Sequence, residues 1–274
     1  MFKSDLLKGK SAVITGAGTG IGKALGLAFA QHGANLLLAA RNLERLDKAA
    51  EEMRSHGVRV KTLAVDVSEP KDVRAMVGAC CSQFGQIDIL VNNAAANFIR
   101  PSKMLTPVRW KKVLDIVLNG SFYGCIEAGK AMLEQKNGGS IINMIATYAW
   151  TGAPGLAPSA SAKAGVLALT RSLGVEWASL GVRVNAIAPG FIDTPQSRER
   201  LWPTEDIRSK MLKSVPMGRF GTLEEVTNLG LFLASGLSAY STGAVFTADG
   251  GQSLGKGALE MMETLAVVRT GQGK

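Results

Sequence analysis

The chain has 274 residues, and 46% of them are hydrophobic, which is enough to fill the core of one α/β domain. Its net charge of +9 suits phosphate-rich small molecules, but the basic residues are scattered and form no run with interleaved aromatics, so nucleic-acid binding is not indicated. Two histidines and three cysteines provide neither a cluster at metal-ligand spacing nor a disulfide framework.

No apolar stretch reaches the length of a bilayer, which argues against a membrane partner. The first apolar strand begins about ten residues after Met1, which leaves no room for a signal or transit peptide. We therefore expect a soluble, cytoplasmic protein.

The segment Ser11–Gly22 reads as a short apolar strand, a glycine-rich turn and the start of a helix that continues to His32. Glycines in such a turn let the backbone approach a pyrophosphate, whose charge is met by free N–H groups at the helix N-terminus. A second strand at Asn35–Ala39 completes the context of a dinucleotide site. Without that context, the turn could equally be an ordinary strand-to-helix connection.

The second strand ends in Ala39-Ala40-Arg41, where an acidic residue would hold the ribose 2′-hydroxyl of NAD. A carboxylate there would repel a 2′-phosphate, whereas a guanidinium binds one through two hydrogen bonds. Arg41 therefore predicts NADP(H). The alternative is that Arg41 simply opens a solvated helix over Asn42–Ser55.

Further strand-length apolar runs occur at Ile87–Val91, Ser140–Ile145 and Val182–Ala188, and they alternate with segments of helical period. This alternation predicts a parallel, doubly wound α/β sheet. No linker or internal repeat interrupts the pattern, so we expect a single domain over residues 1–274.

Six segments, taken in order, look like the successive signatures of the short-chain dehydrogenase/reductase family: Thr15–Gly22, Asp66–Val67, Asn92–Ala94, Ser161–Gly165, Arg183–Gly190 and Asp249–Gly251. The resemblance covers about residues 8–253 and implies a Rossmann-like fold, followed by a C-terminal extension at 254–274 with a short helical stretch. It also implies that two long helices, Thr106–Glu134 and Pro158–Leu180, pair the subunits of a homotetramer.

The resemblance further implies cofactor contacts. Asp66 would accept a hydrogen bond from the adenine amino group, Asn92 would line the adenosine side, and Lys163 would hold the nicotinamide ribose. Pro189–Thr194 would close over the nicotinamide. The full cofactor set is Gly16, Thr19, Gly20, Ile21, Gly22, Arg41, Asp66, Val67, Asn92, Lys163, Pro189, Gly190, Ile192 and Thr194.

The chain departs from this family at the catalytic positions. Members reduce ketones or oxidise alcohols with Asn, Ser, Tyr and Lys. Counting back from Lys163, the tyrosine position holds Ser159 and the serine position holds Ala146, while the asparagine position holds Val117. An ordinary tyrosine-dependent carbonyl reductase is therefore not expected.

Two substitutes lie nearby in the sequence. Tyr148 follows the strand Ser140–Ile145, and Asn97 lies in the loop after the strand Ile87–Val91. Together with the surrounding segments Asn92–Ile99, Asp115–Gly120 and Pro158–Lys163, this arrangement resembles the mitochondrial type of 2,4-dienoyl-CoA reductase. That resemblance implies an acyl-CoA thioester substrate and the NADPH-dependent reduction of 2,4-dienoyl-CoA to 3-enoyl-CoA in the degradation of unsaturated fatty acids.

Such a reaction places negative charge on the thioester oxygen, so it needs hydrogen-bond donors there. Tyr148 and Asn97 would donate to that oxygen, and Tyr148 would also supply or relay a proton, helped by the Lys163 cation. Ser159 would bond the cofactor's ribose or phosphate, or would only begin a helix. Phe98 would contact the acyl chain, and Arg200 the coenzyme A phosphates.

Three other functions fit the same residues. An enoyl-CoA reductase would use the same donors with hydride going to the β-carbon. A carbonyl reductase would use Tyr148 from its shifted position. A catalytically silent NADP-binding protein would retain Arg41 and Lys163, although it would have no reason to retain Tyr148 and Asn97 together.

Overall fold

The computed structural model describes residues 2–255 and residue 262, and the predicted helical stretch beyond residue 257 otherwise lies outside this part of the chain. Seven strands form one parallel sheet in the order β3-β2-β1-β4-β5-β6-β7. The strands are β1 (Ser11–Thr15), β2 (Asn35–Ala40), β3 (Val60–Ala64), β4 (Ile89–Asn92), β5 (Gly139–Met144), β6 (Val182–Pro189) and β7 (Val245–Ala248). The predicted doubly wound α/β fold is confirmed.

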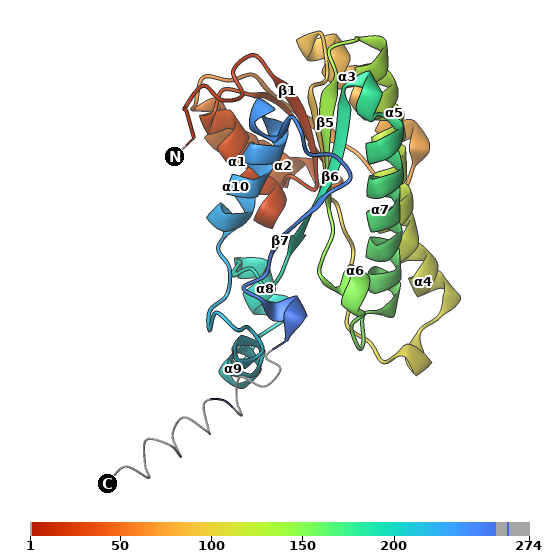
Figure 1. The fold of residues 1–274 in the computed structure, drawn as a ribbon, viewed down its shortest axis with the longest axis vertical. Helices are drawn as coiled ribbons and strands as arrows, with labels where there is room; N and C mark the ends of the chain where they lie inside the picture. Colours follow the sequence, from red (N-terminus) through yellow and green to blue (C-terminus); the bar gives the residue numbers. More distant parts are fainter. Residues whose placement is uncertain (1, 256–261, 263–274) are drawn as a thin grey trace.

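Helices cover both faces of the sheet (Figure 1). The layer on one face is α1 (Gly20–Gln31), α2 (Leu43–Arg54) and α10 (Leu223–Ala234); on the other it is α3 (Pro70–Phe84), α5 (Gly120–Glu134) and α7 (Ala157–Glu176). Each face has its own apolar core: Phe29 and Leu38 are fully buried in the first, Met76 and Ile141 in the second. This burial on both faces explains why the strands read as continuous apolar runs.

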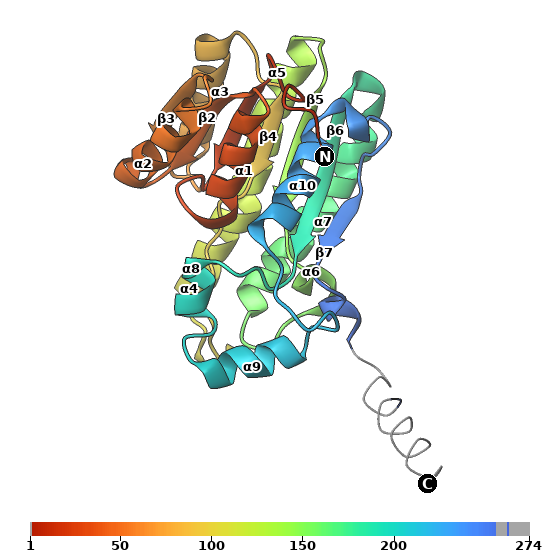
Figure 2. The ribbon, with the colours of Figure 1, turned by 90° about the vertical axis from the view of Figure 1, so that its left-hand side faces the viewer.

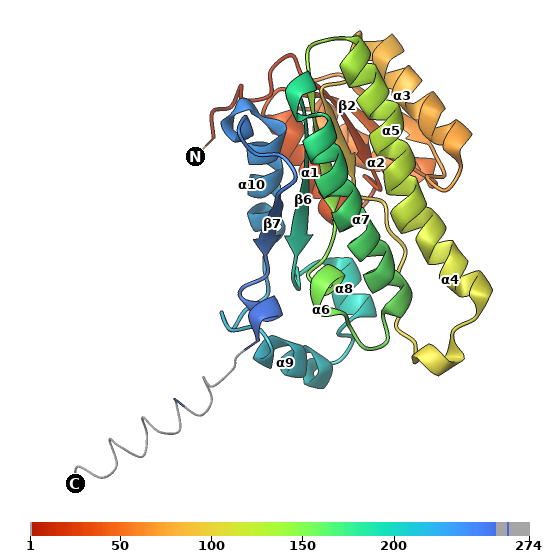
Figure 3. The same ribbon diagram turned by 45° about the vertical axis from the view of Figure 1, so that its right-hand side comes forward.

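The predicted helix over Thr106–Glu134 is interrupted. It consists of α4 (Pro107–Leu114), a π-helical turn (Asp115–Asn119) and α5, which follow one another along a single line (Figure 3). The side chain of Thr106 caps α4 by accepting from the N–H of Arg109. Turns of this kind are frequent at functional sites, and here the turn contains Val117.

The strand order reverses between β1 and β4, which pair through Ile14 and Val91. Ligands of such sheets bind in the crevice beyond the carboxyl ends of the strands at this reversal. Beyond these ends lie α6 (Tyr148–Thr151), α8 (Pro195–Arg200) and α9 (Glu205–Lys213) (Figure 2).

Among the described residues, no helix combines the length and the apolar character needed to cross a bilayer. The cytoplasmic location stays a prediction.

Candidate active site

The glycine-rich turn is shaped for a close backbone approach. Gly16 and Gly20 adopt φ values of 66° and 55°, which side chains rarely allow. A Cβ on Gly22 would lie 2.4 Å from the carbonyl oxygen of Gly16, so no larger residue fits there. Within the described part of the chain, the N-cap Thr19 makes no side-chain capping bond to α1. The first-turn N–H groups of α1 can therefore receive an anion such as a pyrophosphate.

A cavity of 220 Å³ adjoins this turn between the ends of β2, β3 and β4. It is lined by Gly16, Gly18, Thr19, Ala40, Arg41, Asn42, Arg45, Val65, Asp66, Val67, Ala94, Ala95 and Ile116. Hydrogen bonds from the hydroxyl and backbone N–H of Ser68, at 2.6 and 3.0 Å from Oδ1, lower the pKa of Asp66 and keep it an acceptor. We call this space the adenosine cavity. Arg41, Asp66 and Val67 all lie on its wall.

The side chain of Asn92 is directed into the protein instead. Its Nδ2 donates to Asn143 Oδ1 at 2.9 Å and to Ser121 O at 3.3 Å, and the residue is only 4% exposed. The neighbouring Asn93 faces the glycine-rich turn, where its Nδ2 donates to the carbonyl of Thr15 at 2.9 Å. Sequence reasoning did not assign Asn93 a role, although its place directly after β4 points to this edge of the sheet.

A second space, of 350 Å³, lies between the glycine-rich turn and the segment after β6. It is lined by Thr19, Gly20, Ile21, Asn93, Gly190, Phe191, Ile192, Thr194, Gln196, Ser197, Leu201 and Trp202. A Cβ on Gly190 would lie 2.7 Å from Cα of Asp249, so this position also requires glycine. Six of the lining residues are predicted cofactor contacts, and they come from two distant segments: Thr19, Gly20, Ile21, Gly190, Ile192 and Thr194.

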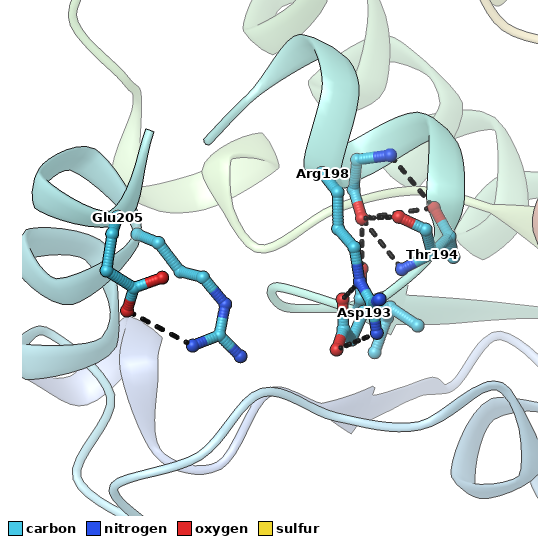
Figure 4. A network of polar contacts seen from close by, with 7 residues as sticks. Asp193, Thr194, Arg198 and Glu205 are labelled. Atoms are coloured by element: carbon cyan, nitrogen blue, oxygen red, sulfur yellow. Dashed lines mark hydrogen bonds and ion pairs between the residues drawn. The ribbon is translucent and has the colours of Figure 1, made fainter. Parts of the chain in front are cut away.

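The start of α8 is held by a dense polar network (Figure 4). The Thr194 hydroxyl accepts from the N–H of Ser197 at 3.0 Å, while the Ser197 hydroxyl accepts from the N–H of Thr194 at 2.8 Å. Arg198 donates twice to Asp193, at 2.7 and 2.8 Å, and these bonds lower the pKa of Asp193. The network fixes the segment that follows Pro189 in place. Arg200 is the last residue of α8.

Tyr148, Ser159 and Lys163 come together beyond the end of β5. Tyr148 is the first residue of α6, and its hydroxyl lies 3.1 Å from the hydroxyl of Ser159. Ser159 is in the first turn of α7 and is 2% exposed. Within the described residues, the hydrogen-bond partner of its side chain is thus Tyr148. One turn later, Lys163 is 5% exposed and donates from Nζ to the carbonyl of Met144.

Burial raises the pKa of Tyr148, and the hydrogen bond with Ser159 opposes this effect. Because the ordinary pKa of tyrosine is already near 10, the phenol stays protonated at neutral pH. Tyr148 can therefore donate a hydrogen bond to a developing oxyanion.

Two of the three altered family positions, Val117 and Ala146, carry no polar side chain. Val117 is fully buried and packs in an apolar cluster with Val113 and Ala162. Ala146 contributes its carbonyl, which accepts from the N–H of Ala149 at 2.9 Å. The reactive groups on this side of the site are thus Tyr148, Ser159 and Lys163.

Asn97 and Phe98 lie in the irregular segment after β4. Asn97 is exposed, whereas Phe98 is partly buried against the Val117 cluster. The backbone N–H of Arg100 donates to Gly155 O at 2.9 Å, which joins this segment to the loop after α6. The segment that carries Asn97 is therefore joined to the loop that follows α6, the helix that begins at Tyr148.

Lys163 leads to a testable pH dependence of stability. Burial lowers the pKa of Lys163 to about 8 from 10.5. Between those values the unfolded chain holds a proton that the folded chain has released, so stability rises with pH. The destabilisation caused by burying the charged Lys163 side chain is complete below pH 8 and disappears towards pH 10.5. We expect the free energy of unfolding of wild type, relative to Lys163→Met, to rise by about 1 kcal/mol per pH unit in this window. Urea unfolding at pH 7 to 10 measures it, and a constant difference would contradict the assignment.

A family model described as enoyl-(acyl carrier protein) reductase matches residues 16–253. The chain is 43% identical to the Bacillus subtilis protein named "Probable 2,4-dienoyl-CoA reductase [(2E)-enoyl-CoA-producing]", over 89% of this chain and 97% of the relative. It is 41% identical to a Caenorhabditis elegans "Probable 2,4-dienoyl-CoA reductase 3 [(3E)-enoyl-CoA-producing]", over 92% and 83%. It is also 36% identical to the 3-oxoacyl-[acyl-carrier-protein] reductase FabG of Chlamydia muridarum, over 91% and 100%. A crystal structure of a short chain dehydrogenase from Bacillus anthracis matches with a TM-score of 0.82 and 42% identity, covering 90% of this chain and 97% of that one.

Proposed function

The chain belongs to the short-chain dehydrogenase/reductase family of nicotinamide-dependent oxidoreductases, and we propose that it reduces 2,4-dienoyl-CoA thioesters with NADPH. The observation that carries the proposal is the contact between Tyr148 and Ser159 beside Lys163. It supports a phenol that acts from α6, while the family's usual tyrosine position on α7 holds a serine. Relatives named as dienoyl-CoA reductases support the same substrate class.

In the proposed reaction, the δ-carbon of the dienoyl chain would receive a hydride, which is the chemistry that a reduced nicotinamide would supply when bound. Tyr148 Oη and the Asn97 side-chain amide donate hydrogen bonds to the thioester oxygen, on which negative charge collects as the double bonds shift. Each donor lowers the activation barrier by about 3 kcal/mol in a dry site. A proton then adds to the α-carbon, supplied or relayed by Tyr148, which gives a 3-enoyl-CoA.

Lys163 and the glycine-rich turn serve the cofactor in this proposal. The buried ammonium of Lys163 holds the nicotinamide ribose and strengthens the neighbouring donors, and Ser159 orients the phenol of Tyr148. Arg41 lies on the wall of the adenosine cavity, where a guanidinium suits the 2′-phosphate of NADPH. Phe98 and Arg200 are the proposed contacts to the acyl chain and to the coenzyme A phosphates.

The FabG relatives raise a 3-oxoacyl substrate as a competing possibility. Carbonyl reduction in this family uses a serine and a tyrosine at positions that hold Ala146 and Ser159 here. The absence of both groups favours the dienoyl thioester. In that substrate, the carbon that receives the hydride does not need an acidic group beside it.

The proposal is tested by following NADPH oxidation, with NADH in parallel, for trans-2,trans-4-decadienoyl-CoA, trans-2-decenoyl-CoA and a 3-oxoacyl thioester. We expect NADPH-dependent turnover of the dienoyl thioester alone. Turnover restricted to the 3-oxoacyl or the enoyl thioester, or no turnover at all, would reject it.

We also propose a homotetramer that is built through α5 and α7. These helices and α4 present apolar side chains to solvent, among them Val108, Phe122 and Val175, which are 77%, 44% and 79% exposed. Burying these side chains between subunits would remove apolar surface from water. Sedimentation equilibrium should give a four-chain mass, and a monomer at micromolar concentration would contradict the assembly.

A further inference from the structure

Two arginines, not one, line the adenosine cavity: Arg41 and Arg45. Arg41 directly follows β2, and Arg45 is in the first turn of α2, where its N–H donates to Oδ1 of the N-cap Asn42 at 2.9 Å. A Cβ on Gly18 would lie 3.4 Å from the Cβ of Arg45. The stem of Arg45 therefore rests against the glycine-rich turn, at the edge of the cofactor path.

Another cavity, of 380 Å³, lies on the far side of Arg45 between α1, α2 and α8. It is lined by Gly18, Thr19, Lys23, Arg45, Lys48, Ala49, Gln196 and Glu199. Arg45 lines both this space and the adenosine cavity, so its side chain stands at the boundary between them. From there it can turn towards either one.

The basic groups around this boundary differ in their partners. Lys23 Nζ lies 2.6 Å from Glu52 Oε1, and Lys48 Nζ lies 2.7 Å from Glu44 Oε1. Within residues 2–255, neither Arg41 nor Arg45 has a carboxylate at ion-pair distance. Two guanidinium groups that form no ion pair within these residues thus share one cavity wall with the Asp66 carboxylate, whereas both lysines are paired with glutamates.

We propose that Arg45 is a second determinant of NADPH selectivity, holding the 2′-phosphate together with Arg41. The inference rests on the proposed use of NADPH. A phosphate presents several acceptor oxygens, and two guanidinium groups from one turn can each form charge-assisted bonds to it. The N-terminal end of α2 adds a favourable dipole for the same anion. NADH lacks this phosphate, so Arg45 contributes little to its binding.

The test is calorimetric titration of wild type, Arg45→Ala, Arg41→Ala and Lys48→Ala with NADPH, NADH, 2′,5′-ADP and 5′-ADP. We expect Arg45→Ala to weaken NADPH and 2′,5′-ADP about tenfold or more, as Arg41→Ala does, and to leave NADH and 5′-ADP nearly unchanged. Lys48→Ala is the matched control, because Lys48 lines the neighbouring cavity but is paired with Glu44. We expect Lys48→Ala to leave the affinities for all four ligands unchanged.

Two results would overturn the proposal. One is that Arg45→Ala leaves NADPH affinity intact; the other is that it weakens NADPH and NADH equally, which would indicate a structural role. If Arg45 served only as a counter-charge for Glu199, the loss in Arg45→Ala would come from the uncompensated Glu199 carboxylate, and adding Glu199→Gln would restore NADPH affinity. We expect the double variant to bind NADPH as weakly as Arg45→Ala. The cofactor proposal fails separately, if wild type binds NADH at least as tightly as NADPH.

Discussion

We expect replacement of Tyr148 by phenylalanine to lower kcat for the proposed dienoyl thioester substrate by about 10²–10³-fold, because the variant lacks one of the two donors proposed for the thioester oxygen. The ring of Tyr148 packs beside α7 with or without the hydroxyl, so the fold and NADPH affinity stay close to wild type. Steady-state kinetics together with direct NADPH titration separate these quantities. A variant that retains more than about a tenth of wild-type kcat would remove Tyr148 from the mechanism.

Two further variants sharpen this result. Tyr240→Phe is the matched control, since Tyr240 is fully exposed on the surface and should behave like wild type. Ser159→Ala keeps the phenol but removes its hydrogen-bond partner. We expect a smaller loss in kcat than for Tyr148→Phe, with little change in KM for NADPH. A rise in that KM without loss of kcat would indicate that Ser159 binds the cofactor.

Asn97→Ala is expected to lower kcat by a similar factor of about 10², because Asn97 is proposed as the second donor to the same oxygen. Asn97 is exposed in a segment outside any helix or strand, so its replacement should not alter thermal stability. The control is Asn137→Ala, at an exposed position before β5 and so at the opposite end of that strand from Tyr148.

The double variant tests whether the two donors act on one oxygen. Residues that share a function show non-additive effects, so Tyr148→Phe combined with Asn97→Ala should lose less than the product of the single losses. Strictly multiplicative losses would mean that the two side chains act at separate points. In that case Asn97 would belong to substrate binding.

The fold could be predicted from the sequence because its signals are local. Apolar runs of strand length, spaced by helical segments, specify a parallel sheet whichever residues fill the core. The glycine-rich turn was also readable, since a glycine that must adopt positive φ or accept a close backbone contact, as Gly16 and Gly22 do, has no substitute. The π-turn around Val117 could not be read, because hydrophobic periodicity does not distinguish one extra residue in a helical turn.

Side-chain pairing was harder to anticipate. Asn92 is the last residue of β4, where a cavity residue is expected, yet its amide turns inward to Asn143 on β5. Ser159 was expected to contact the cofactor or to begin a helix, and its contact with Tyr148 depends on how α6 packs on α7. Arg45 gave no signal in sequence, because an arginine in the first turn of a solvated helix is ordinary until the adjoining cavities are known.

The most direct measurement follows a deuteride from stereospecifically labelled NADPH into the product of trans-2,trans-4-decadienoyl-CoA, with the position of the label read by NMR. The proposal predicts deuterium at C5, a hydrogen from solvent at C2, and a double bond between C3 and C4. Deuterium at C3 would contradict it by showing reduction of the enoyl bond. Absence of label transfer from NADPH would reject the reductase itself.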